Sequence, residues 1–224
     1  VAAAVDRDPR AESDRRRIGD VLLSVENVSL AFGGVRAITD VSFDIRKGEI
    51  RAIIGPNGAG KTSMLNVING FYFPQQGVIT FKGEKRREMR PYFAATSGIS
   101  RTFQNVALFK GMTTLDNIMA GRYLHTHATF LEVAMQLPRA RREERTNREA
   151  AEEIIEFLEI QNIRKTPVAR LPYGLQKRLE LGRALAAEPK VLLLDEPMAG
   201  MNIEEKQDLC RYILDVNDHY GTTV

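Results

Sequence analysis

Apolar and polar residues alternate over the first third of the chain, and a period of two predicts β-strands. Residues 22–32 and 41–45 show this alternation, and the apolar run over residues 50–55 is also expected to be a strand. From residue 61 to residue 71 the apolar positions change to helical spacing. The pattern therefore predicts a strand, a glycine-rich loop and a helix in direct succession.

The middle of the chain has a different pattern. Helix-forming residues dominate from Thr113 to Ile160, and Thr113 and Asp116 are spaced as a capping pair at a helix start. After Leu171 the sequence predicts a helix, a buried strand over VLLLDE and a final helix. Alternating strands and helices are typical of an α/β fold, which here contains a helical insertion.

Composition excludes several classes of protein. The chain has 224 residues, of which 43% are hydrophobic and 27% charged, and this balance is typical of a globular domain. Its 32 basic and 29 acidic residues give a net charge of +3, which is too small to predict a nucleic-acid partner. No apolar run approaches the roughly 20 residues that span a bilayer. Residues 1–20 are polar and are expected to form a disordered arm.

The stretch GPNGAGKT matches the phosphate-binding P-loop pattern at every fixed position. Its glycines allow backbone N–H groups to surround phosphate oxygens, and the following helix contributes the positive end of its dipole. Lys61 is expected to reach the β- and γ-phosphates, and the Thr62 hydroxyl to bind Mg²⁺. A glycine-rich turn with a chance lysine is the alternative. The predicted nucleotide-binding residues here are Gly55, Pro56, Asn57, Gly58, Ala59, Gly60, Lys61, Thr62 and Ser63.

Two acidic residues end the strand VLLLDE, at the edge where α/β sheets bind ligands. Asp195 is predicted to bind Mg²⁺, and Glu196 to orient or deprotonate an attacking water. A helix cap is the alternative role of this pair. Gln104 is a candidate metal ligand that senses the γ-phosphate, and Phe32 a candidate stacking partner for a base. Taken alone, Gln104 is only a polar residue, and an aromatic residue at a strand end such as Phe32 usually belongs to the core.

In chain order, Phe32, GPNGAGKT, Gln104, LPYGLQKR, VLLLDEP and AGMN resemble the ATP-binding subunits of ABC transporters, and the resemblance covers residues 22–224. It implies a P-loop NTPase core lobe with an antiparallel β edge. It also implies a helical subdomain inserted at about residues 106–172, within an ATPase domain of residues 21–224. The implied activity is ATP hydrolysis with Mg²⁺, in which Lys61, Gln104 and Glu196 take part.

The stretch LPYGLQ occupies the place of the family signature, which is usually Leu-Ser-Gly-Gly-Gln. In the family this turn faces the γ-phosphate bound by a second subunit, so a homo- or heterodimer is implied. The sequence departs from the pattern at three places, because Pro172, Tyr173 and Leu175 replace the serine, a glycine and the glutamine. Gly174 remains, and the four residues are expected to contact the partner's nucleotide.

The stretches LPYG, RTFQN and AGMN resemble the subunit that powers bacterial branched-chain amino-acid importers. The resemblance implies permease partners that dock near Phe109, Met112 and Leu115, and a periplasmic binding protein that acts indirectly. It places the chain at the cytoplasmic face of the inner membrane. Importers of urea, amides or other amino acids are alternatives, as are non-transport ATPases and a regulatory cassette that does not hydrolyse ATP.

The end of the sequence, YGTTV, lies where the family begins a strand that carries a switch histidine. His219 precedes this position and does not match it. The C-terminus is therefore expected to be truncated, so that this chain binds Mg-ATP but hydrolyses it poorly.

Overall fold

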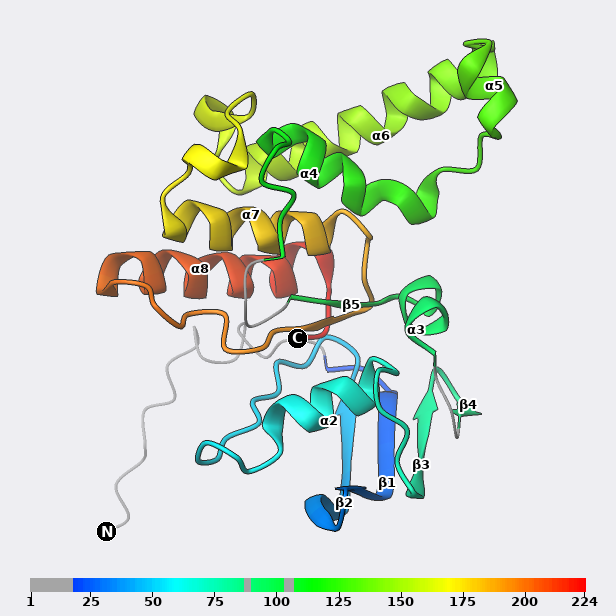
Figure 1. The fold of residues 1–224 in the computed structure, drawn as a ribbon, viewed down its shortest axis with the longest axis vertical. Helices are drawn as coiled ribbons and strands as arrows, with labels where there is room; N and C mark the ends of the chain where they lie inside the picture. Colours follow the sequence, from blue (N-terminus) through cyan, green and yellow to red (C-terminus); the bar gives the residue numbers. More distant parts are fainter. Residues whose placement is uncertain (1–17, 87–89, 103–106) are drawn as a thin grey trace, which may run out of the picture.

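The computed structural model describes residues 18–86, 90–102 and 107–224. Strands β1–β4 and helix α2 lie at one end of the molecule, and helices α4 to α8 at the other (Figure 1). The larger sheet is antiparallel, with strand order β2-β1-β3-β4. Its strands are β1 (Val21–Phe32), β2 (Val35–Arg46), β3 (Gln76–Phe81) and β4 (Glu84–Arg86).

The register of β1 is set by a local irregularity. Asn27 has a left-handed φ of 50°, and the pairing with β2 shifts between Val25 and Val28. The extra residue lets Val28 and Leu30 both point into the core, where they are at most 2% exposed. The alternation read from the sequence thus places its apolar side chains on one face in spite of the bulge.

A second sheet carries the other half of the site. Strands β5 (Ile99–Arg101) and β6 (Val191–Leu193) pair in parallel. The side chains of β6 alternate between two cores: Leu192 packs with the helices, whereas Val191 and Leu193 pack with α2 and the larger sheet. Both faces of this short strand are therefore covered, as expected for a parallel sheet.

The predicted strand over residues 50–55 is wrong, because the structure assigns no strand there. The segment starts as one: Arg51 N donates to Val224 O at 2.8 Å, and Val224 N donates to Glu49 O at 3.0 Å. Beyond this point Ile53 and Ile54 are 40% and 92% exposed. Apolar content alone cannot make a strand, since each backbone group also needs a neighbour to pair with.

The remaining helices form the helical half of the molecule and its link to the strands. Helix α7 packs along α4, and α6 also packs against α4. These helices share their apolar core with α8, which belongs to the last part of the chain. The helical elements are α2 (Lys61–Ile68), α3 (Pro91–Ser97), α4 (Thr114–Gly121), η1 (Arg122–His125), α5 (Phe130–Ala134), α6 (Pro138–Phe157), η2 (Gln161–Ile163), η3 (Val168–Arg170), α7 (Tyr173–Leu185) and α8 (Ile203–Tyr220).

Most of the predicted N-terminal arm, residues 1–17, lies outside the described residues. Gly19 and Asp20 were assigned to this arm, yet both pair with the backbone of Lys47, at 2.9 and 3.0 Å. Within the described ranges, no helix is long and apolar enough to cross a bilayer.

Candidate nucleotide site

The P-loop leads into the N-terminus of α2. Gly60 immediately precedes the helix and has a left-handed φ of 86°. A Cβ atom at this position would lie 2.3 Å from the carbonyl oxygen of Ala37 in β2, so only glycine fits. The helix start has no side-chain cap. Its backbone N–H groups therefore suit an anion such as phosphate.

Lys61 and Thr62 extend from the first turn of α2. The Lys61 ammonium donates to the carbonyl oxygens of Gly55 and Pro56, both at 2.9 Å, and so it lies within the loop. The Thr62 hydroxyl donates to Asp195 Oδ1 at 3.2 Å. The structure thus brings together the predicted phosphate loop and the acidic end of β6, which are 133 residues apart in sequence.

Asp195 is 3% exposed and has charged and polar partners on both oxygens. Arg101, the last residue of β5, donates from Nη2 to Asp195 Oδ2 at 2.9 Å. The same guanidinium donates from Nη1 to the side chain of Asn66 in α2. Arg101 was not predicted as a site residue, although it belongs to the stretch RTFQN that also contains the candidate Gln104.

Glu196 follows Asp195 and is exposed, with a left-handed φ of 45°. A non-glycine residue in this region is strained, and strain of this kind persists where the surrounding structure enforces it. The predicted metal ligand Gln104 lies outside the described residues. The predicted metal ligands that can be described, the Thr62 hydroxyl and the Asp195 carboxylate, are oxygen ligands of the kind that Mg²⁺ prefers.

The aromatic candidate Phe32 ends β1 and is 44% exposed. Its ring meets that of Tyr72 edge to face, with a centroid distance of 4.9 Å. Tyr72 was not predicted as a site residue, although the run FYF after α2 marks it. The two rings form a partly exposed aromatic surface.

The signature turn is packed against the loop that follows β6. Pro172 precedes α7 and Tyr173 begins it. Gly174 is buried so closely that a Cβ atom there would lie 2.1 Å from Oε1 of Glu205. The Tyr173 ring also lies against Gly200. Leu175 packs at the edge of the helical core. The turn therefore contacts both this loop, at Gly200, and the first turn of α8, at Glu205.

A buried ion pair lies beneath that turn. Lys177 and Glu180, one turn apart on α7, have side chains that are 2% and 3% exposed, and their charged atoms are 3.3 Å apart. The Lys177 ammonium also lies 6.0 Å from the centre of the Tyr173 ring. The burial of this pair could not be predicted, because a Lys and a Glu three residues apart usually lie on a solvated helix face.

The predicted permease surface is partly exposed. Phe109 and Met112 are 52% and 45% exposed, whereas Leu115 packs against the helical core. The Asn117 side chain fixes the backbone of Phe109 through two hydrogen bonds, at 2.9 and 3.1 Å. The Arg183 guanidinium lies 5.8 Å from the centre of the Phe109 ring. Burial lowers the pKa of the Arg183 guanidinium below its ordinary value.

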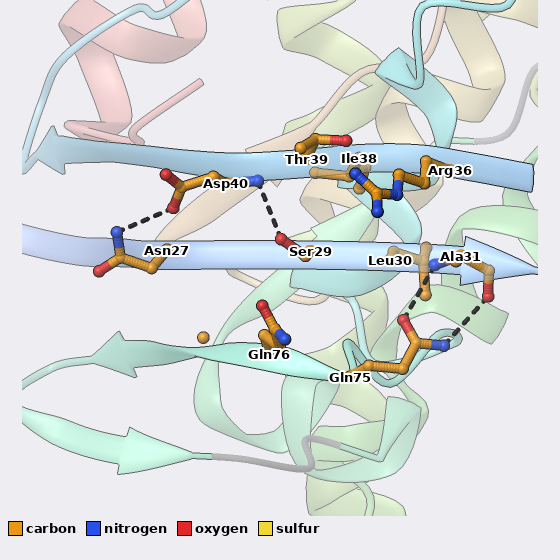
Figure 2. A pocket seen from close by; sticks show the side chains of 11 residues that line it. Asn27, Ser29, Leu30, Ala31, Arg36, Ile38, Thr39, Asp40, Gln75 and Gln76 are labelled. Carbon is orange, nitrogen blue, oxygen red and sulfur yellow. Dashed lines mark hydrogen bonds between the residues drawn. The ribbon is translucent and has the colours of Figure 1, made fainter.

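A hollow of about 650 Å³ on the larger sheet lies away from these residues (Figure 2). Its polar groups largely satisfy one another: Asn27 donates to Asp40 at 2.9 Å, and Asp40 N donates to the Ser29 hydroxyl at 2.9 Å. Gln75 is bound to the backbone of Ala31 in both directions. The hollow contains none of the predicted nucleotide residues, so it is not the candidate site.

A P-loop at the start of a helix, facing an acidic pair at the carboxyl end of a parallel strand, defines a nucleotide-binding ATPase of the P-loop class. The sequence pattern of the ABC transporter family matches residues 38–199. The chain belongs to the ABC transporter family. The predicted fold class, an ABC-type ATPase with an antiparallel β edge, is confirmed by this match and by solved relatives.

Relatives agree with this assignment. The chain is 36% identical over 203 residues to the high-affinity branched-chain amino acid transport ATP-binding protein BraF of Pseudomonas aeruginosa, covering 91% of this chain and 80% of BraF. It is 33% identical to LivG of Escherichia coli K12, with the same coverage. A nucleotide-free ATP-binding cassette of an ABC transporter superposes with a TM-score of 0.77 at 32% identity, covering 91% and 79% of the two chains. The ADP conformation of the cassette MJ1267 gives 0.78 at the same identity and coverage.

Proposed function

We propose that this chain is the ATP-hydrolysing subunit of an importer, with branched-chain amino acids as its cargo. The observation that carries the proposal is the 3.2 Å contact between the Thr62 hydroxyl and Asp195, beside the Lys61 ammonium. The cargo is inferred from the transport named for BraF and LivG. Importers of other amino acids, urea or amides remain the alternative.

ATP binds with its phosphates at the N-terminus of α2. The loop from Gly55 to Ser63 surrounds the phosphates with the backbone N–H groups of its residues other than Pro56, and Lys61 neutralises the phosphate charge. Phe32 contacts the base. Thr62 and Asp195 are placed to hold Mg²⁺, with Gln104 as a further ligand. When bound, Mg²⁺ neutralises charge on the β- and γ-phosphates and so favours attack at phosphorus.

Glu196 is the proposed general base. It extends from the strained turn after β6, next to Asp195 but with its own side chain exposed. A carboxylate in this place can accept a proton from a water in line with the γ-phosphate. Lys61 holds that phosphate during the attack.

Two subunits close around the nucleotides. The residues Pro172, Tyr173, Gly174 and Leu175 contact the ATP held by the partner subunit, and the start of α7 directs its N–H groups at the γ-phosphate. Pro172 has no hydroxyl, so the contact is made by backbone groups. Closure moves the permeases through the surface around Phe109 and Met112, on the cytoplasmic side of the membrane. A substrate-binding protein acts at the other side.

Hydrolysis by a Glu196→Gln variant tests this proposal. The amide keeps the size of the side chain but cannot act as a base, so phosphate release should fall at least ~100-fold while ATP still binds. Glu204→Gln, an exposed neighbour in the first turn of α8, is the matched control and should keep the wild-type rate. Wild-type hydrolysis by Glu196→Gln would refute the assigned base. Uptake of labelled leucine and urea by the complete importer in vesicles distinguishes the cargoes.

A further inference from the structure

Arg101 connects three elements of the nucleotide site. It ends β5, and its guanidinium reaches Asp195 after β6 and Asn66 in α2. Asn66 lies one helical turn after Thr62 and on the same face of α2. Arg101 therefore links Asp195 to α2, the helix that also carries Thr62.

The buried ion pair of Arg101 and Asp195 holds the Asp195 carboxylate in one orientation. Both side chains are 4% exposed, and their charged atoms are 2.9 Å apart. A buried pair gains little net stability from its charges, because desolvation of the ions offsets their attraction. What such a pair supplies is orientation, since the planar guanidinium holds its partners in a rigid fork.

The hydrogen bond from the Arg101 guanidinium determines which Asp195 oxygen faces the Thr62 hydroxyl. Oδ2 accepts from Arg101, whereas Oδ1 accepts from the Thr62 hydroxyl at 3.2 Å. Oδ1 therefore faces the hydroxyl that is proposed to bind the metal, and Oδ2 is turned away from it. Without Arg101, the carboxylate could rotate out of the orientation in which one of its oxygens faces the Thr62 hydroxyl.

We propose that Arg101 is a positioning residue, which orients Asp195 toward Thr62 and thereby sets the affinity of the site for the Mg²⁺ that accompanies ATP. This inference rests on the proposed function. The charge of Arg101 and the shape of its guanidinium can be varied separately. Arg101→Lys keeps the positive charge but replaces the planar guanidinium fork, which is directed at Asp195 and Asn66, with a flexible point cation.

The test compares Arg101→Lys and Asn66→Ala with the wild type. Asn66→Ala removes one of the two hydrogen-bond partners of the Arg101 guanidinium and leaves every charge in place. Arg178→Lys is the matched control, because Arg178 forms a 2.9 Å pair with Asp208 away from the site. Binding of a fluorescent ATP analogue is measured first in EDTA and then over a Mg²⁺ titration. A Mn²⁺ titration followed by EPR counts the bound metal directly.

We expect binding in EDTA to stay within about twofold of the wild type in all variants, since phosphate contacts come from the P-loop. The Mg²⁺ concentration for half-maximal binding should rise about tenfold in Arg101→Lys, which corresponds to about 1.4 kcal/mol. Asn66→Ala should show a smaller rise in the same direction, and Arg178→Lys none.

Wild-type Mg²⁺ dependence in both Arg101→Lys and Asn66→Ala would overturn the role of Arg101. If Arg101→Lys fails to fold, as circular dichroism would show, Asn66→Ala decides the question alone. Absence of ATP binding by the wild-type chain in both EDTA and Mg²⁺ would instead contradict the proposed function. The two failures are therefore distinguishable.

Discussion

Replacing Gly174 with alanine tests how the signature turn is held. The new Cβ would lie 2.1 Å from Oε1 of Glu205, more than an ångström inside an ordinary contact. The Glu205 side chain is flexible, but it also forms a hydrogen bond at the start of α8. Its Oε2 accepts from the backbone N of Asn202 at 3.0 Å and completes the capping box of α8. Gly174→Ala therefore forces Glu205 out of that cap.

The magnitude follows from two opposing effects. Loss of the cap costs about 1 kcal/mol, whereas exchanging glycine for alanine in a helix gains roughly 0.5–1 kcal/mol. In the wild-type background Gly174→Ala should therefore be neutral or destabilising by up to about 1 kcal/mol, a range that also allows for residual strain. In a Glu205→Ala background the contact is gone, and the same substitution should stabilise by roughly 0.5–1 kcal/mol.

Urea unfolding of the four proteins measures this double-mutant cycle. The expected coupling between Gly174→Ala and Glu205→Ala is about 1 kcal/mol. Gly111→Ala is the matched control, because a Cβ there meets no atom within 4 Å, and it should be additive with Glu205→Ala. Additivity of Gly174→Ala with Glu205→Ala, within about 0.3 kcal/mol, would refute the packing described for the signature turn.

The pH dependence of stability provides a further prediction. Glu188 accepts a hydrogen bond from the buried Arg122, which lowers the pKa of the Glu188 carboxyl below its ordinary value near 4.5. A lowered pKa contributes stability above the unfolded value and loses it as pH falls through the folded value. Melting temperatures from pH 7 to pH 3 should therefore fall less steeply on the acid side for Glu188→Gln than for the wild type. The effect is small, since the side chain is 61% exposed, and identical profiles would contradict it.

Much of the fold could be predicted because its signals are local. The P-loop glycines, the apolar strand before Asp195 and the Thr113 capping box each depend on neighbours in sequence, and α2, β6 and α4 form where expected. The strand over residues 50–55 failed because strand formation depends on a distant partner. Only residues next to Val224 find one within the described chain.

The motif residues of the site could be predicted, but the buried charged contacts around them could not. The motifs identified Lys61, Thr62 and Asp195, and the fold brings them together. Arg101 and the pair of Lys177 and Glu180 were missed for a common reason. Nothing in a sequence distinguishes a buried charge from an exposed one, since the difference depends on packing between elements far apart in the chain.

Equilibrium binding of ATP to the wild type and to Lys61→Ala tests the central claim most directly. The ammonium lies within the P-loop, bound to the carbonyl oxygens of Gly55 and Pro56. Removing this point charge should weaken binding of Mg-ATP by at least roughly tenfold, the effect of losing about 1.4 kcal/mol. Lys82→Ala, which removes a lysine bound to Ser97 O in another part of the chain, should bind as the wild type does. Equal affinity of the wild type and Lys61→Ala for Mg-ATP would show that nucleotide does not bind at the P-loop.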